Sequence, residues 1–168
     1  MTTAAIKFLD TLTDEQERAA RFPFDGEDRF DWHFIPRERK GVPLKTMTAT
    51  QRSAALDLLR TALSEDGFTK AESIRQLEQI LFELEGRDIR DPDLYFFMVF
   101  GEPAEGNTWG WRYEGHHISQ NWTIVNGTRV ASIRNARLLR GYPSAPIAPS
   151  QTAWSVLNAS ISSAIPAA

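Results

Sequence analysis

Hydrophobic residues recur at helical spacing in three segments of the first half of the chain, residues 5–12, 49–64 and 74–84. Apolar side chains three and four positions apart share one face of a helix, so each segment predicts an amphipathic helix. A further short helix is expected over 13–20, so that residues 5–20 form either two short helices or one kinked helix. Two of these helices begin with a capping box, in which two side chains each bond the other residue's backbone N–H. The boxes are Thr13 with Gln16 and Thr48 with Gln51. We expect Gly67 to separate the last two helices and Gly86 to end the last one.

Strand patterns appear once before the second pair of helices and then fill the second half. Phe30, Trp32 and Phe34 alternate with their neighbours and predict a half-buried strand over residues 30–35, ended by Pro36. A continuous apolar run over 94–100 predicts a buried strand. Further strands are expected at 108–113, 116–125 and 128–133, joined by turns at Glu114-Gly115 and Asn126-Gly127. The pattern predicts an α+β fold, with amino-terminal helices followed by an antiparallel β-meander.

The composition changes after residue 133. Arginines three positions apart have no apolar partner pattern, and a stretch rich in Pro, Ala and Ser follows. Such composition is typical of loops and tails. We therefore divide the chain into a partial α+β domain over 1–133 and an irregular carboxy-terminal tail over 134–168, which is either disordered or translated in a shifted frame.

Composition narrows the classes of function. The 168 residues suit one domain, and a net charge of −3 gives no electrostatic footprint for nucleic acid. The absence of Cys excludes disulfides, thiolate metal sites and thiol nucleophiles. Charged residues interrupt the first 21 positions and no run of 18 apolar residues occurs. We expect a soluble, cytoplasmic protein with no nucleic-acid or membrane partner.

Four sequence blocks carry a resemblance to a known family. They are residues 22–25, 32–41, 91–96 and 110–121. In order and spacing they resemble the amino-terminal half of a family of uncharacterised bacterial proteins, domain of unknown function 3500. The resemblance implies that members continue about as far again and carry further His residues there. It therefore implies that this chain is truncated, and it brings no established activity.

Polar side chains alternate along the strand predicted to begin at His116. Alternation sends His117, Ser119 and Asn121 to one face. That face is either a solvated outer surface or a binding or catalytic surface. In the catalytic interpretation His117 acts as a general base beside Glu114, with Ser119 and Asn121 in line. Adjacent histidines on a regular strand point apart, so a metal site needs a bulge at the preceding glycine; the sequence identifies neither a metal nor a cofactor.

Basic residues suggest a second kind of site. Arg37 and Arg39 lie in a charged loop, and with Arg112 and His33 they are candidates for binding an anion through guanidinium forks. A solvated loop is the alternative. Two hypotheses follow. The first is a hydrolase-like or metal-assisted enzyme whose site needs a missing carboxy-terminal half. The second is a non-catalytic domain that binds an anionic small molecule or protein partner. An unfinished sheet edge after Ile133 also predicts self-association.

Overall fold

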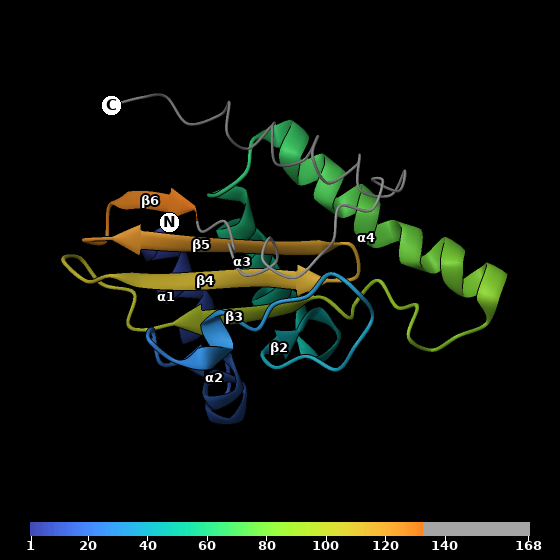
Figure 1. Cartoon of the computed structure of the whole chain (residues 1–168), viewed down its shortest axis with the longest axis horizontal. Helices are drawn as coiled ribbons and strands as arrows, with labels where there is room; N and C mark the ends of the chain where they lie inside the picture. Colours follow the sequence, from blue (N-terminus) through green and yellow to red (C-terminus); the bar gives the residue numbers. More distant parts are fainter. Residues whose placement is uncertain (133–168) are drawn as a thin grey trace, which may run out of the picture.

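The computed structural model describes residues 1–132 and confirms the predicted α+β class, with helices first and the sheet after them (Figure 1). The helices are α1 (Thr2–Asp10), α2 (Asp14–Ala20), α3 (Ala49–Arg60) and α4 (Glu65–Glu85). The strands are β1 (Arg21–Phe22), β2 (Val42–Pro43), β3 (Phe96–Phe100), β4 (Trp109–Gly115), β5 (Ile118–Val125) and β6 (Arg129–Ser132). Short 3-10 turns lie at Glu27–Arg29 and Leu44–Thr46. The predicted tail over 134–168 lies outside the described residues.

The local signals at the helix ends are mostly confirmed. Both predicted capping boxes form, at the starts of α2 and α3. Gly86 ends α4 in the left-handed conformation, with φ +64°. The predicted break at Gly67 is wrong. Ser64 is the N-cap residue of α4, and its hydroxyl accepts a hydrogen bond from the Gly67 N–H at 3.1 Å. Gly67 therefore lies in the first turn of α4, which begins two residues earlier than it.

The sheet is a meander extended at one end. Its order is β1-β3-β4-β5-β6, with β2 also paired to β3. The pairs from β3 to β6 are antiparallel, as predicted, whereas β1 pairs with β3 in parallel. Within residues 1–132, β6 has a paired neighbour on one side only, so the predicted self-association through this edge stays a prediction.

The turn between β4 and β5 lies one residue pair later than predicted. Gly115 pairs with Ile118, so β4 continues through Glu114 and Gly115, and His116 and His117 form the turn. The predicted turn at Glu114-Gly115 is therefore wrong. The next hairpin is confirmed: Asn126 and Gly127 both take left-handed conformations, with φ of +53° and +70°.

The two faces of the sheet have different covers. On one face, Phe97, Trp111 and neighbouring apolar residues join α1 and α3 in the hydrophobic core, where the Phe8 and Phe97 rings lie 5.5 Å apart. The opposite face carries Arg112, Glu114 and the polar side of β5, and the segment 23–41 lies over it (Figure 1). The polar face is therefore an interior surface and not the solvated outer face considered from the sequence.

The predicted strand over 30–35 is wrong, and the structure shows why its alternation is misleading. Backbone carbonyls of alternate residues in this segment accept hydrogen bonds from two arginine side chains, Arg112 and Arg39. The accepting residues are 29, 31, 33 and 35. Guanidinium groups thus satisfy the backbone where a neighbouring strand would otherwise do so. This segment is irregular, with a turn at Phe30 and a bend at residues 34–36; it is anchored by side chains and belongs to no sheet.

Helix α4 is buried along one narrow stripe. Ala71, Arg75 and Glu78, spaced one turn apart, are buried, whereas Leu77 and Leu84 are 50% and 77% exposed. The apolar side of this helix predicted from the sequence therefore stays largely exposed among the described residues. None of the helices within residues 1–132 is both long and apolar enough to cross a membrane.

Candidate functional site

Three of the predicted catalytic residues lie together on the covered face of the sheet. The register places Glu114 opposite Ser119 and Arg112 opposite Asn121. Arg112 Nε donates to Asn121 Oδ1 at 2.6 Å, and the Ser119 hydroxyl donates to Glu114 Oε2 at 3.3 Å. Asn121 Nδ2 in turn donates to the Ser119 Oγ at 3.3 Å. Together with Arg39, these residues form what we call the Glu114 network.

Arg39 closes the Glu114 network from the side of the segment 23–41. Its Nε donates to Glu114 Oε1 at 2.9 Å, and both side chains are at most 5% exposed. Its remaining nitrogens donate to backbone carbonyls of residues 33, 35, 37 and 115. Burial lowers the pKa of Arg112, whose nitrogens are likewise engaged by carbonyls. Most donors of these arginines therefore already have acceptors within the chain, which is the arrangement of a structural clamp.

His117, the predicted general base, lies apart from the Glu114 network. It sits in the β4–β5 turn with φ +62°, and its backbone N–H donates to the Phe34 carbonyl at 2.7 Å. Its exposed ring stacks on His116, with centroids 3.7 Å apart. The four predicted catalytic residues thus divide into a buried group of three and a turn histidine. Their catalytic role stays a prediction.

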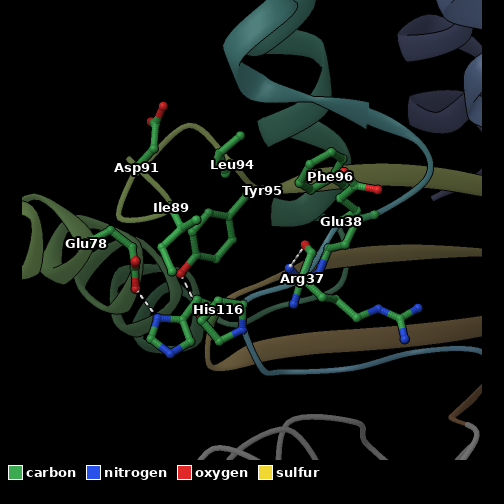
Figure 2. A pocket seen from close by; sticks show the side chains of 11 residues that line it. Arg37, Glu38, Glu78, Ile89, Asp91, Leu94, Tyr95, Phe96 and His116 are labelled. Carbon is green, nitrogen blue, oxygen red and sulfur yellow. Dashed lines mark hydrogen bonds and ion pairs between the residues drawn. The ribbon is translucent and has the colours of Figure 1, made fainter. Parts of the chain in front are cut away.

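The segment 23–41 and the start of β3 also enclose one side of a pocket of about 430 Å³ (Figure 2). This volume falls in the range of small-molecule sites. Its walls combine apolar and aromatic side chains with a few charged ones. The lining residues are Pro36, Arg37, Glu38, Arg39, Glu78, Ile89, Asp91, Leu94, Tyr95, Phe96 and His116.

A carboxylate–imidazole pair lies at one end of this pocket. Glu78 reaches from α4, and its Oε1 contacts Nδ1 of His116 in the β4–β5 turn (Figure 2). Glu78 is 1% exposed, and its other oxygen, Oε2, has no hydrogen-bond partner among residues 1–132. Arg90 Nη1 lies 3.9 Å from that oxygen, beyond hydrogen-bonding distance, and 3.0 Å from His116 Nδ1.

Burial shifts both members of the pair toward their neutral forms. Desolvation raises the pKa of Glu78 above its ordinary value. Desolvation, with the nearby Arg90 and Arg39 charges, lowers the pKa of His116 to about 4. At neutral pH the imidazole is therefore uncharged. In the tautomer with its proton on Nδ1, His116 donates to Glu78, and Nε2, which lies 3.4 Å from Arg90 Nη1, is the ring nitrogen that can accept a proton from a bound molecule.

Tyr95 holds the histidine turn in place. Its hydroxyl donates to the His116 carbonyl at 2.6 Å (Figure 2). Its ring covers Gly115. A Cβ added at Gly115 would lie 2.4 Å from that ring, so only glycine leaves room for it. Burial raises the pKa of Tyr95 further above its ordinary value, which keeps the hydroxyl a donor. Tyr95 therefore forms part of the pocket wall and also fixes the position of His116.

The predicted anion-binding residues are dispersed. Arg39 and Arg112 belong to the Glu114 network. Arg37 lines the pocket but donates to Asp31 at 2.7 Å. His33 contributes its backbone: its N–H donates to Glu114 at 3.3 Å and its carbonyl accepts from Arg39 at 3.0 Å. The anion-binding role of these residues stays a prediction; Arg37 and Arg39 line the pocket, whereas His33 and Arg112 do not appear in its lining.

Sequence reasoning missed Glu78, Tyr95 and His116 as site residues. A signal for Glu78 existed: with Ala71 and Arg75 it forms one stripe of α4, where charged side chains on the buried side need a specific partner. His116 was assigned to the core face of a strand, whereas it lies in the turn, which was predicted two residues too early. Within residues 1–132, no group of three or more His, Cys, Asp or Glu is arranged to hold a metal ion.

The architecture is that of an α+β domain with a small-molecule pocket between its sheet, its longest helix and a covering segment. The family described as protein of unknown function (DUF3500) matches residues 1–133, and the chain belongs to this family. The earlier resemblance is thereby confirmed for the amino-terminal part. Comparison with curated proteins and with solved structures gives no match.

Proposed function

We propose that this domain binds a small organic molecule in the pocket and exchanges a proton with it through the Glu78–His116 pair, as hydrolase-like enzymes do. One observation carries the proposal: a carboxylate and an imidazole, both largely buried, meet in the lining of a pocket of about 430 Å³. A perturbed carboxylate–imidazole pair in a cleft is the arrangement expected for general acid–base chemistry.

The geometry assigns a role to each partner. His116 accepts the proton at Nε2, and Glu78 stabilises the resulting imidazolium through Nδ1. Arg90, at 3.0 Å from Nδ1, disfavours the charged ring, so the proton is readily passed on. Tyr95 holds the turn that carries His116. Each of these groups is a positioned side chain acting at one end of one pocket.

The lining residues named above, the Glu78–His116 pair among them, lie within residues 1–132. The hydrolase hypothesis from the sequence invoked a missing carboxy-terminal half. The proposed Glu78–His116 pair acts together with groups from outside residues 1–132. A metal-assisted reaction takes its metal ligands from those groups. The pocket and the pair can therefore be assayed on this chain as it stands.

The shifts in pKa give the proposal a pH dependence. The pair accepts a proton only while it is not already fully protonated. Activity should therefore persist below pH 6.5, the ordinary pKa of His, and be lost as the pH falls from the raised pKa of Glu78 toward the His116 value of about 4. An acid limb of kcat/KM centred at 6.5 would contradict this assignment.

The test compares the two stacked histidines on a panel of p-nitrophenyl esters and p-nitroanilides. General base catalysis is worth about 10²-fold or more, so His116→Gln should lower kcat/KM by at least that factor. His117→Gln is the matched control, because it changes the neighbouring ring in the same turn, and it should cost less than about threefold. Absence of turnover by the chain, or equal losses in both variants, would refute the proposal.

The anion-binding alternative remains a second candidate through Arg37. Its side chain is one-third exposed at the pocket, and it has guanidinium nitrogens beyond the one that donates to Asp31. Two of the other predicted donors, Arg39 and Arg112, already bond within the chain. In this alternative Arg37→Ala weakens the binding of an anion and His117→Ala does not.

A further inference from the structure

The charges that line the pocket do not cancel. Within residues 1–132, three of them have close ion-pair partners: Arg37 with Asp31 at 2.7 Å, Arg39 with Glu114 at 2.9 Å, and Asp91 with Lys45 at 2.8 Å. Glu38 forms no ion pair with another described residue, and Glu78 has only the distant Arg90. The remaining charge at the pocket is therefore negative.

Arg90 does not neutralise Glu78, because it is shared. Its Nε donates to Glu85 at 2.9 Å, whereas its closest approach to Glu78 Oε2 is 3.9 Å. Two carboxylates thus flank one guanidinium. His116, with a pKa of about 4, brings no positive charge at neutral pH.

The carboxylate of Glu78 is the most demanding of these groups. It is 1% exposed and one of its oxygens has no donor. A buried carboxylate without a full set of donors among the described residues is destabilising in general, unless a cation or a proton neutralises it. A cationic group at this end of the pocket lowers that cost through its charge, whereas an anionic group raises it.

The remaining walls suit the stem of such a ligand. Leu94, Ile89 and Pro36 provide apolar surface, and Tyr95 and Phe96 provide aromatic rings, which also attract cations. In Figure 2 Tyr95 and Ile89 lie on the side of Glu78 and His116, with Glu38 and Arg37 across from them.

We infer that the pocket binds an organic cation, a primary amine on an apolar stem, with its ammonium group toward Glu78. The inference rests on the pocket of the proposed function and names its substrate class. It does not require that His116 transfer a proton. It also opposes the anionic ligand expected from the sequence, so one experiment can decide between the two chemistries.

The experiment is calorimetric titration of the whole chain with benzylamine, benzyl alcohol and benzoate at neutral pH. The three probes share a ring and a similar size and differ in charge. Benzylamine should bind at least about tenfold more tightly than benzyl alcohol, and benzoate most weakly, since tenfold corresponds to a single modest charge interaction. Benzoate binding as tightly as benzylamine, or no binding of any probe, would overturn the inference.

Two α4 variants locate the effect. Glu78→Gln keeps the side-chain shape but removes the charge, and it should reduce the preference for benzylamine over benzyl alcohol to about one. Glu83→Gln is the matched control, because it removes one exposed carboxylate from the same helix, and it should preserve the preference. An amine preference unchanged in Glu78→Gln would also overturn the inference.

The outcomes separate this inference from the proposed function. If benzylamine is preferred through Glu78 while His116→Gln leaves ester and anilide turnover unchanged, the ligand class stands and the proton-transfer role falls. If turnover depends on His116 but benzoate is the preferred probe, the catalytic role stands and the amine class falls.

Discussion

Two polar clusters lie near the β4–β5 turn, one on the two strands and one between the turn and α4. They differ in how far hydrogen bonds compensate the burial of their polar groups. In the Glu114 network, two guanidinium groups, one carboxylate, an amide and a hydroxyl bond one another and backbone carbonyls. In the Glu78–His116 pair, one carboxylate oxygen has no donor, and both pKa values are displaced. Both clusters contain a buried glutamate, yet only the second leaves bonding capacity unused.

The difference indicates which cluster is structural and which is available for chemistry. A saturated network fixes a unique arrangement, here the segment 23–41 on the sheet, and has nothing left to offer a ligand. In a pair with unused bonding capacity, the unpaired polar atom has an uncompensated desolvation free energy, which a ligand at the pocket can reduce. The sequence analysis chose Glu114 as catalytic, whereas the bonding pattern favours Glu78.

The first prediction tests the structural assignment and has the largest expected effect. Glu114→Ala leaves Arg39 and Arg112 buried without their shared carboxylate, since both lie within 3.5 Å of it. Breaking a buried ion pair from one side costs about 3–5 kcal/mol of unfolding free energy. Urea unfolding measures this loss.

Ser119→Ala is the control for that prediction, because it removes two long hydrogen bonds of the same network, each at 3.3 Å, and leaves the ion pairs in place. Its expected cost is about 1 kcal/mol. A loss for Glu114→Ala no greater than that of Ser119→Ala would mean that the Glu114 network does not anchor the segment 23–41.

Features that depend on neighbouring residues could be predicted from the sequence, whereas features that depend on side chains from other parts of the chain could not. The capping boxes of α2 and α3 and the alternation of Ser119 and Asn121 were predictable, because they depend on neighbours in the chain. The irregular backbone of segment 30–35 was not predictable, because its carbonyls accept hydrogen bonds from the side chains of Arg39, a few residues further along, and of Arg112 in β4. Such long-range side-chain partners leave no periodic signal.

Prediction of the site residues depended on the position of a single turn. Placing the β4–β5 turn one residue pair early put His117 on the ladder with Ser119, whereas the observed turn leaves His117 outside and directs His116 to Glu78. The shift is two positions, so Ser119 and Asn121 keep their predicted face, but His116 and His117 move from the strand into the turn. The partner, Glu78, lies 38 positions away on α4 and could not be paired with His116 by spacing alone.

The second prediction tests whether His117 is a turn residue. Its left-handed backbone, with φ +62°, is unfavourable for a side chain with a Cβ by about 1 kcal/mol or more, and glycine removes that cost. His117→Gly should therefore raise the unfolding free energy, by up to about 1 kcal/mol after the entropy cost of glycine. A thermal melt beside His33→Gly, whose φ is not left-handed, provides the comparison. Destabilisation by His117→Gly would show that the ring stack on His116 outweighs the backbone strain.

The last prediction has the smallest expected change in stability and compares the two glutamates directly. Glu78→Gln keeps a group able to bond His116 and removes a desolvated charge whose Oε2 has no donor. The losses and gains nearly cancel, so the unfolding free energy at neutral pH should change by less than about 1 kcal/mol. Because burial raises the pKa of Glu78 above its value in the unfolded chain, the wild-type chain loses stability as the pH rises from that ordinary value to the raised one. The variant should therefore gain relative to the wild-type chain across this pH interval. Urea unfolding at several pH values measures both effects. A loss as large as that of Glu114→Ala would show that Glu78 is a structural anchor too, and the distinction between a saturated network and an unsaturated pair would fail.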